Sequence, residues 1–398
     1  MRIVNNEDAK QQAWATIDDM EAELISMSHA IHSRPELCYE EHFAAGELSS
    51  GLRRHGIAVD APAFDLDTSF VGRAGSTGPH VVICCEYDAL PGIGHGCGHN
   101  IIGTAGVGAG IALAPLADAL RGRVTILGTP AEEGGGGKLR LLERGAFADA
   151  DVAMMIHPEP ANVEVVPYLA NETLIITMHG RAAHASSSAR AGINALDALV
   201  LGYQGAQLIR ANLRRDERVF GIITDGGVAD NVIPAAATAR YRIRARDTGR
   251  LTGLRNALTD CFEGAARQVG ATCTIESLGG YLDLQANRAL AAAFRTNAEA
   301  LGRVFLDPAS VPIEAAGSTD MGNISHVMPV IHPVLDVGTR CAGHTLEMTA
   351  ASITPAADRC VIDAAKAMAA TTIDYWTSAQ LRSAVAQEWN ATVGSAAS

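Results

Sequence analysis

The first strand of the predicted central sheet is Val81-Val82-Ile83-Cys84-Cys85, an uninterrupted apolar run. A strand without polar residues on either face is typical of a parallel sheet that helices cover on both sides. The loop after it, Asp88-Ala89-Leu90-Pro91-Gly92, places a carboxylate directly beyond the strand. Ligands of open α/β sheets bind beyond the carboxyl ends of the strands, so Asp88 is a candidate site residue.

Two more predicted strands end in residues that can carry chemistry. Residues 123–128 lead into Glu132-Glu133, and residues 151–156 end at His157. With the helices predicted between them, these strands indicate an α/β fold whose mixed, mainly parallel sheet is flanked by helices. The three strand ends could therefore converge on one site.

Three helices are predicted around this sheet. Apolar residues recur at helical spacing over residues 9–33, and Pro35 closes that helix. Further helices are expected at residues 40–55 and at residues 100–119, where small apolar residues allow close packing on the sheet.

The pattern changes near Glu172, where a different domain is predicted. Strands and helices there follow the order β-α-β-β-α-β, which is that of a small ferredoxin-like domain. The predicted segments are residues 173–178, 194–213, 219–224, 237–245, 251–269 and 271–277. Candidate site residues lie on both sides of this region, so it is interpreted as an insertion. The expected domains are residues 1–172 continued by 284–398, with 173–283 inserted.

Length, composition and net charge indicate a protein of several domains that does not bind nucleic acid. A chain of 398 residues is expected to form two or three domains, and 48% hydrophobic residues provide a large core. The net charge of −13 argues against nucleic-acid binding, which needs a basic surface.

The sequence predicts a cytoplasmic protein. Its eight cysteines lack the spacing of a disulfide scaffold, and residues 1–12 lack the apolar segment of a signal peptide. No apolar run reaches the length of about 18 residues that a membrane span needs. A reducing compartment and no membrane partner are therefore expected.

The turn Cys97-Gly98-His99 is the first candidate metal motif. A Cys-x-His pair alone is a weak signal, and both residues could be inert core residues. Gly94 and Gly96 precede the pair and let the backbone turn sharply. A thiolate, an imidazole and nearby carboxylates together suit zinc or manganese.

The second motif is Glu132-Glu133, which directly precedes Gly134 to Gly137. The pair could be a solvated helix start, where the helix dipole favours acids. On an extended segment, however, adjacent side chains point opposite ways. One carboxylate could then hold a metal while the other moves a proton, which is typically worth ~10²–10⁴-fold in rate.

For several single residues, both a structural and a functional interpretation stay open. His157, His344 and His184 could each be structural or functional, and Asn231 could be a turn residue before Pro234. His95 is a reserve ligand near the Cys97 turn. The remaining histidines considered are expected at the surface: His32, His42 and His55.

Two glycine-rich stretches do not indicate nucleotide binding. Gly106 to Gly110 lacks the preceding strand and the later acid of a dinucleotide fingerprint, which disfavours a nicotinamide oxidoreductase. Gly134 to Gly137 is not followed by the Gly-Lys-Ser/Thr of a P-loop.

Taken in order, the motifs resemble the M20 metallopeptidases, especially the amidohydrolase branch with aminoacylase-like and aminobenzoyl-glutamate-hydrolase-like proteins. The resemblance covers nearly the whole chain. The matching stretches are Glu86 to Gly92, Gly96 to Asn100, Pro130 to Gly137, His157-Pro158, Gly180 to Ser186 and Gly317 to Asn323.

The resemblance implies a Zn-exopeptidase-like catalytic domain with an inserted lid domain that also forms a dimer. It implies two divalent metal ions, zinc or manganese, with ligands Cys97, His99, Glu133, His157 and His344. Glu132 would be the general base and acid, and His184 would help to stabilise the oxyanion. Asn231 would contact substrate, and Asp88 would support the metal ligands from behind.

This chain departs from the family pattern at two places. Asn100 and Ile102 stand where many members of the branch have Asp and His. Glu86 stands where peptidase branches have a metal-binding His, and it is left out of the ligand set. The roles of Glu86 and Asn100 stay open.

The predicted function is metal-dependent hydrolysis of a linear amide bond in a small N-acyl amino acid or dipeptide-like substrate. The alternatives are an aromatic amide such as an aminobenzoyl amino acid, hydrolytic deamination, or a metal-binding scaffold without turnover. The expected partners are the small substrate and a second copy of the chain, in a homodimer or a larger homo-oligomer.

Overall fold

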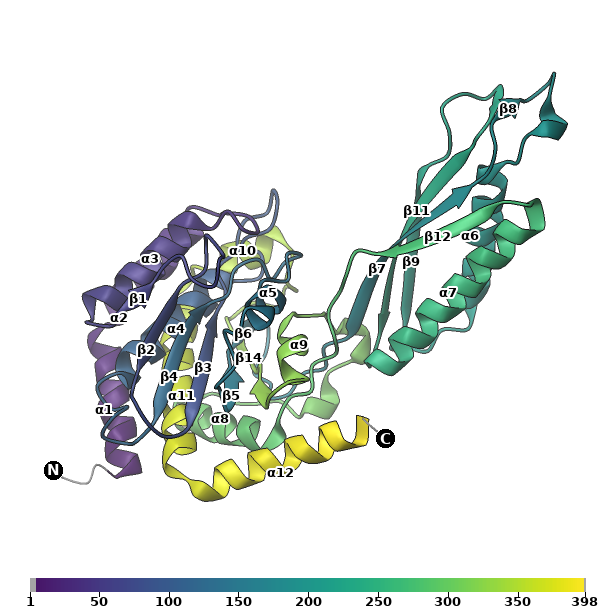
Figure 1. The fold of residues 1–398 in the computed structure, drawn as a ribbon. Helices are drawn as coiled ribbons and strands as arrows, with labels where there is room; N and C mark the ends of the chain where they lie inside the picture. The colour runs from purple at the N-terminus through teal and green to yellow at the C-terminus, as the bar shows by residue number, and fades with distance from the viewer. Residues whose placement is uncertain (1–4, 397–398) are drawn as a thin grey trace. The chain divides into compact units, whose positions relative to one another are not determined.

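The computed structural model describes residues 5–396, which form two compact units of an α/β protein (Figure 1). Unit 1 contains the chain up to Val166, Gln285–Val311 and the chain from Asn323. Unit 2 contains Pro167–Leu284 and Pro312–Gly322. No helix within residues 5–396 is both long enough and apolar enough to cross a membrane.

Unit 1 is built on a six-stranded mixed sheet. The central strand β3 is parallel to both of its neighbours, β4 and β5, and all of its residues are buried. This confirms the buried parallel strand that the apolar run predicts. In sheet order the strands are β1 (Val59–Asp60), β2 (Val71–Ala74), β4 (Arg123–Gly128), β3 (His80–Cys85), β5 (Val152–Met154) and β13 (Val330–Ile331).

Helices flank this sheet, and α4 is buried along its whole length. Its glycines allow this, because a Cβ at Gly106 would lie 2.5 Å from Cys85 Sγ and one at Gly110 would lie 2.1 Å from Ile126 Cγ1. The helices of this part are α1 (Asn6–Asp19), α2 (Glu21–His32), α3 (His42–Arg54), α4 (His99–Leu113), α5 (Gly137–Glu143), α8 (Arg288–Ala300), α9 (Met321–Ser325), α10 (Leu346–Ala351), α11 (Pro355–Thr377) and α12 (Ala379–Ala396).

Two predicted helices were too long. The single helix expected over residues 9–33 is divided at Met20. The acids Asp18, Asp19 and Glu21 lie around the start of α2, where the helix dipole favours negative charge. The helix expected to reach residue 119 ends at Leu113, because Pro115 cannot continue it.

A second, two-stranded parallel sheet pairs β6 (His157–Glu159) with β14 (Val334–Asp336). The strand expected over residues 151–156 ends at Met154, and His157 begins β6 instead of following a strand. The His157 N–H donates to Pro333 O at 2.9 Å, so this pairing fixes the backbone of His157.

Unit 2 contains a four-stranded antiparallel sheet with α6 (Ala195–Ala211) and α7 (Thr248–Val269) on one face (Figure 1). Along the chain the elements follow the predicted order β-α-β-β-α-β. In sheet order the strands are β12 (Thr272–Ser277), β7 (Ala170–His179), β11 (Ala236–Ala245) and β9 (Arg218–Asp225). Leu174, Tyr241 and Phe262 belong to the core that joins helices and sheet.

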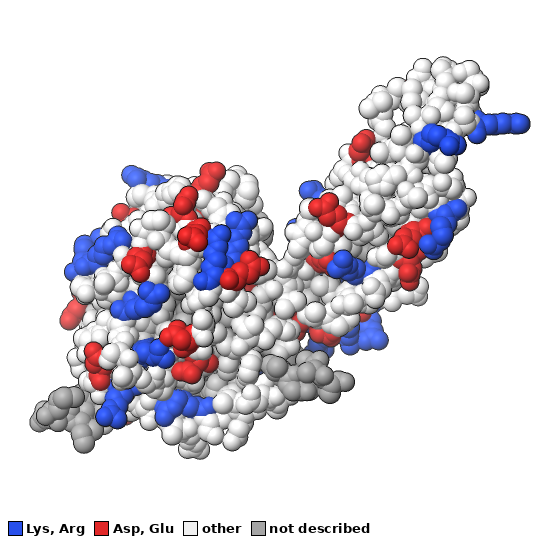
Figure 2. Space-filling view, viewed as in Figure 1, with Lys and Arg blue, Asp and Glu red and all other residues white. Residues whose placement is uncertain are grey.

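Two short paired strands complete unit 2. The strands β8 (Ala183–His184) and β10 (Val232–Ile233) pair with each other. On the face shown in Figure 2, basic and acidic side chains are interspersed. Ion pairs at the surface include Arg54 with the half-buried Glu23 at 2.8 Å.

Candidate metal centre

The carboxyl ends of the central strands of unit 1 carry most of the predicted site residues. Asp88 follows β3, Glu132 and Glu133 follow β4, and His157 begins β6. Just before α4, Gly98 has a left-handed backbone with φ of 69°, which L-residues with a side chain disfavour. This turn buries Cys97 and makes His99 the first residue of α4.

The five predicted ligands and Glu132 lie together. Three overlapping sets each offer one ligand atom per residue, and within a set these atoms lie within 4.8 Å of one another. The sets are Cys97 with His99 and His157, Cys97 with Glu133 and His344, and His99 with Glu132 and Glu133. Side chains from distant parts of the sequence, such as Cys97 and His344, therefore meet in one cluster.

The cluster fits a divalent metal ion. Its donors are a thiol, imidazoles and carboxylates, which are the groups that bind divalent metal ions in proteins. Within the described chain, two buried atoms of the cluster have no hydrogen-bond partner, His99 Nε2 and Glu133 Oε1. Such atoms are rare in folded proteins and require an explanation, and ligation of a metal would supply one.

Asp88 contacts two residues of the cluster, His99 and Glu133. Its Oδ1 lies 3.0 Å from His99 Nδ1, and its Oδ2 accepts the Glu133 N–H at 2.9 Å. A proton on His99 Nδ1 leaves Nε2 as the free lone pair of the neutral ring. Asp88 therefore orients the imidazole and fixes the backbone of the neighbouring ligand.

Burial and charge set the protonation of the cluster. Burial lowers the pKa of His157 to about 3, and the charge of His99 adds to the effect. Burial alone would lower the pKa of His99, but the Asp88, Glu86 and Glu133 carboxylates outweigh it and hold that pKa well above its usual range. Burial and the neighbouring Glu133 raise the pKa of the Cys97 thiol. A bound cation would favour the thiolate instead.

Glu86 lies beside the cluster, paired with a lysine that the sequence analysis did not consider. Lys138 in α5 is fully buried and forms an ion pair with Glu86, whose Oε2 lies 3.5 Å from His99 Nε2. A single lysine after a glycine run gives no sequence signal for such a position.

His332 is a second residue that the sequence analysis missed. It is buried, and its ring centroid lies 5.7 Å from that of His157. Burial lowers its pKa well below the usual range, with the charge of His157 contributing. A signal was available, because Ile331-His332-Pro333 repeats the tripeptide Ile156-His157-Pro158, and the strands before and after His332, β13 and β14, pair with β5 and β6.

Two polar residues near the Cys97 turn, Asn100 and His95, are buried among contacts outside the ligand cluster. The Asn100 amide donates to Ser28 Oγ at 2.9 Å and to Ser352 O at 3.0 Å in the buried interior. His95 is buried, stacks on His32 at 5.9 Å, and belongs to none of the three sets in the described chain. The surface position expected for His32 is wrong, because it is half-buried under this contact, whereas His42 and His55 are exposed.

His184 and Asn231 lie in unit 2 and are brought together there. His184 in β8 pairs with Val232 in β10, and the Ala185 N–H donates to Asn231 O at 3.0 Å. The His184 side chain is exposed, and its Nδ1 accepts the Ser186 N–H at 3.2 Å.

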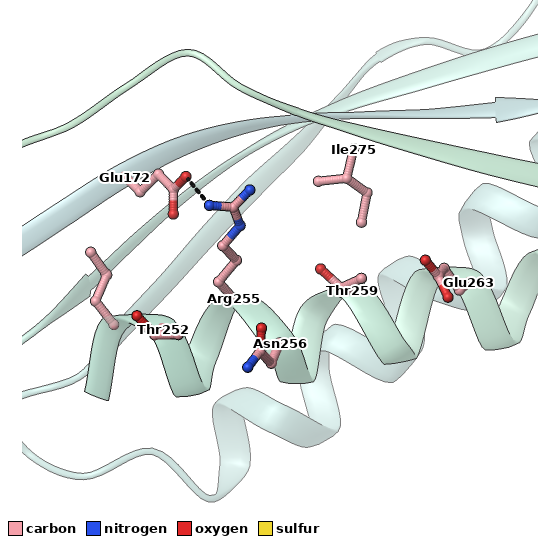
Figure 3. A pocket seen from close by; sticks show the side chains of 8 residues that line it. Glu172, Thr252, Arg255, Asn256, Thr259, Glu263 and Ile275 are labelled. Carbon is pink, nitrogen blue, oxygen red and sulfur yellow. Dashed lines mark ion pairs between the residues drawn. The ribbon is translucent and has the colours of Figure 1, made fainter. Parts of the chain in front are cut away.

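A separate hollow of about 460 Å³ lies on unit 2 and contains no predicted site residue (Figure 3). Its lining includes the ion pair of Arg255 with Glu172 at 3.1 Å. The residues that line it are Glu172, Leu251, Thr252, Arg255, Asn256, Thr259, Glu263 and Ile275. None is a histidine or cysteine, so the hollow lacks the donors of the cluster in unit 1.

Comparison with known proteins identifies relatives along most of the chain. The model of peptidase family M20/M25/M40 matches residues 82–369. Xaa-Arg dipeptidase of Mus musculus is 39% identical over 380 residues, 92% of this chain and 88% of that protein. One of the subunits of p-aminobenzoyl-glutamate hydrolase of Escherichia coli is 28% identical over 458 residues, 95% of each chain.

Solved structures show the same fold. A dinuclear metal-binding peptidase of the M20 family from Bacillus subtilis matches with a TM-score of 0.71 and 19% identity, over 89% of this chain and 98% of that chain. These matches confirm the predicted hydrolase class and the resemblance that the motifs carry. The chain belongs to peptidase family M20/M25/M40.

Proposed function

We propose that this protein hydrolyses a linear amide bond in a dipeptide or a small N-acyl amino acid, with two divalent ions, zinc or manganese. Cys97, His99, Glu133, His157 and His344 would hold the ions. The observation that carries the proposal is the overlap of three ligand sets whose atoms lie within 4.8 Å, with Glu132 in one of them.

Each part of the cluster has its own role in the proposed reaction. When bound, the ions supply Lewis acidity, which polarises a carbonyl and makes water more acidic. Glu132 takes the proton of the attacking water and delivers it to the leaving nitrogen. Asp88 keeps His99 and the Glu133 backbone in place throughout. A scaffold without turnover would not need Glu132 beside its ligands.

The inserted region, residues 173–283, is proposed to act as a lid over the substrate. Its exposed His184 would stabilise the oxyanion, and Asn231, joined to the His184 strand, would contact the substrate. Closure of such a region would exclude water from the reaction.

A homodimer is proposed for this protein, formed through unit 2. Phe220 and Ile222 are exposed on β9, which is an edge strand of its sheet, and Leu208 is exposed on α6. An edge strand with apolar side chains is a ready site for pairing with a second chain. A cytoplasmic location is also proposed, because none of the eight cysteines, all of which lie in the described part of the chain, forms a disulfide.

We order the candidate substrates for assay by the sequence identity of the relatives that cleave them. The 39% identity to a Xaa-Arg dipeptidase favours a dipeptide that ends in arginine over an aminobenzoyl amino acid, whose hydrolase is 28% identical. Dipeptides with C-terminal arginine are therefore the first compounds to test, followed by other dipeptides, N-acyl amino acids and aminobenzoyl-glutamate.

The test combines metal loading with this substrate panel. The purified protein is stripped with a chelator, reloaded with zinc or manganese, and assayed for bound metal and for release of the free amine. We expect turnover of at least one amide class only in the loaded protein. Glu132→Gln should keep its metal and lose turnover. Full turnover by Glu132→Gln, or no cleavage across the panel, would refute the proposal.

A further inference from the structure

The loop that carries Glu132 and Glu133 has an unusual backbone. Ala131, directly before the two acids, has φ of 60°, a left-handed conformation that residues with a side chain rarely adopt. Ala131 is also fully buried. Strained backbone of this kind persists only where its surroundings hold it, and it often lies at functional sites.

The segment of residues 36–41, directly before α3, binds the start of this loop, which runs over residues 131–135. Glu41 is fully buried, and its Oε1 accepts the Ala131 N–H at 2.9 Å. The same oxygen accepts the Tyr39 N–H at 2.9 Å. One buried carboxylate thus joins the strained residue of the loop to a segment about 90 positions earlier in the sequence.

The same segment holds the end of the loop. The Tyr39 hydroxyl donates to Gly135 O at 2.6 Å. A Cβ at Gly135 would lie 2.7 Å from Tyr39 Cε2, so ring and loop are in close contact. The Arg140 guanidinium lies 4.3 Å from the centroid of the Tyr39 ring and covers it. Tyr39 and Glu41 therefore bind the backbone on both sides of Glu132 and Glu133.

The segment is itself anchored. Glu41 directly precedes α3, and the Glu36 carboxylate accepts the Phe43 and Ala44 N–H groups at 2.9 and 3.0 Å. These bonds satisfy donors that the first turn of a helix leaves free. Tyr39 and Glu41 are thus fixed to a regular element.

We propose that Tyr39 and Glu41 are positioning residues of the hydrolase. They hold the loop on both sides of Glu132 and Glu133, so that Glu132 can reach the proton it transfers. Neither side chain touches the substrate in this proposal, and the proposal rests on the proposed function. Misplacement of a reacting group by about 1 Å can cost ~100-fold in rate, which makes the held loop a catalytic requirement.

The test measures kcat and KM at saturating metal for Glu41→Ala, Glu41→Gln and Tyr39→Phe. Glu41→Ala removes the acceptor of the Ala131 N–H and should lower kcat about 10- to 100-fold, with KM within about threefold. Tyr39→Phe removes one hydrogen bond and should lower kcat about 3- to 10-fold. Glu41→Gln keeps an acceptor oxygen and should stay within about threefold of wild type. The matched control is Glu40→Ala, an exposed neighbour, which should leave kcat unchanged.

A second measurement separates positioning from a structural role. If Glu41 acts through Glu132, Glu41→Ala should lower the residual rate of Glu132→Gln by less than about twofold, because effects of residues acting as a unit are not additive. A full additional loss in that background would overturn the proposal. Thermal unfolding establishes that each variant is folded, and Tyr39→Phe decides the question if Glu41→Ala does not fold.

The outcomes also separate this proposal from the proposed function. If Glu132→Gln is inactive while Glu41→Ala and Tyr39→Phe both keep kcat within about twofold, the positioning role is wrong and the hydrolase assignment stands. If Glu132→Gln keeps full turnover, the proposed function fails and the positioning role falls with it.

Discussion

Removal of the Lys138 charge should destabilise unit 1 strongly. Lys138 and Glu86 pair with side-chain exposures of 0% and 1%. Lys138→Met keeps most of the aliphatic length but leaves the Glu86 carboxylate buried without its cation. Breaking a buried pair in this way costs about 3–5 kcal/mol. The His99 imidazole, 3.5 Å from Glu86 Oε2, can compensate in part when protonated, so we expect a loss near the lower limit, about 3 kcal/mol.

The chain contains a suitable probe for this measurement. Its three tryptophans, Trp14, Trp376 and Trp389, all lie in unit 1. Tryptophan fluorescence during urea unfolding of the metal-free protein therefore reports on unit 1 alone. A shift of the urea midpoint without a change of slope would show a change in the free energy of unfolding.

Two further variants make the result decisive. Glu86→Gln combined with Lys138→Met leaves no charge behind and should recover most of the lost stability. Lys366→Met breaks the ion pair with Asp18, whose side chain is 53% exposed, and should cost less than about 1 kcal/mol. The reasoning is refuted if Lys138→Met costs no more than Lys366→Met, or if the double variant is less stable than Lys138→Met.

Three other predictions follow from the same structure. Metal-free protein should lose a few kcal/mol of stability between pH 7.5 and pH 5, as urea unfolding would measure. In the fold, the depressed pKa values of three buried imidazoles keep them neutral in this window, whereas the unfolded chain takes up their protons below about pH 6.5. These imidazoles belong to His95, His157 and His332. His99 and Glu159, whose pKa values are raised in the fold, oppose these three imidazoles in part, and equal stability at both pH values would contradict this account. Asp88→Asn should weaken metal binding about 10- to 100-fold, measured by competition with a chelating dye, and unchanged affinity would remove Asp88 from the support of the ligands. Gly110→Ala should cost about 1–3 kcal/mol, because its Cβ would lie 2.1 Å from Ile126 Cγ1, while Gly46→Ala, with open space around it, should not destabilise.

The sequence was most informative where one chemical reason determined the structure. The apolar residues of β3 required a covered parallel strand, and this located Asp88 beyond its end. Cys97 and His99 were identifiable because thiol and imidazole flank a glycine that the backbone needs at φ of 69°. The assignment of residue roles and of the domain boundaries remains a prediction.

Other features depend on contacts between distant residues, and no local pattern reveals them. Lys138 is recognisable as a buried cation only once Glu86 is known to lie beside it. The Glu41 carboxylate is one of several acids in a polar stretch until its contact with Ala131 is seen. The division of the first helix at Met20 has one sequence signal, the acids Asp18, Asp19 and Glu21 around the start of α2, but the apolar periodicity continues across it and conceals the break.

The order of the ligands along the chain has a consequence for biosynthesis. Cys97 and His344 are about 250 residues apart, and the second unit is encoded between them. At about 5–20 residues per second, a ribosome needs roughly 12–50 s to travel from one codon to the other. During that interval the nascent chain exposes a thiol that has not yet met its last partner. We therefore expect the complete set of proposed ligands to bind cations only after synthesis has passed residue 344, so that cation addition after synthesis should suffice to load the protein.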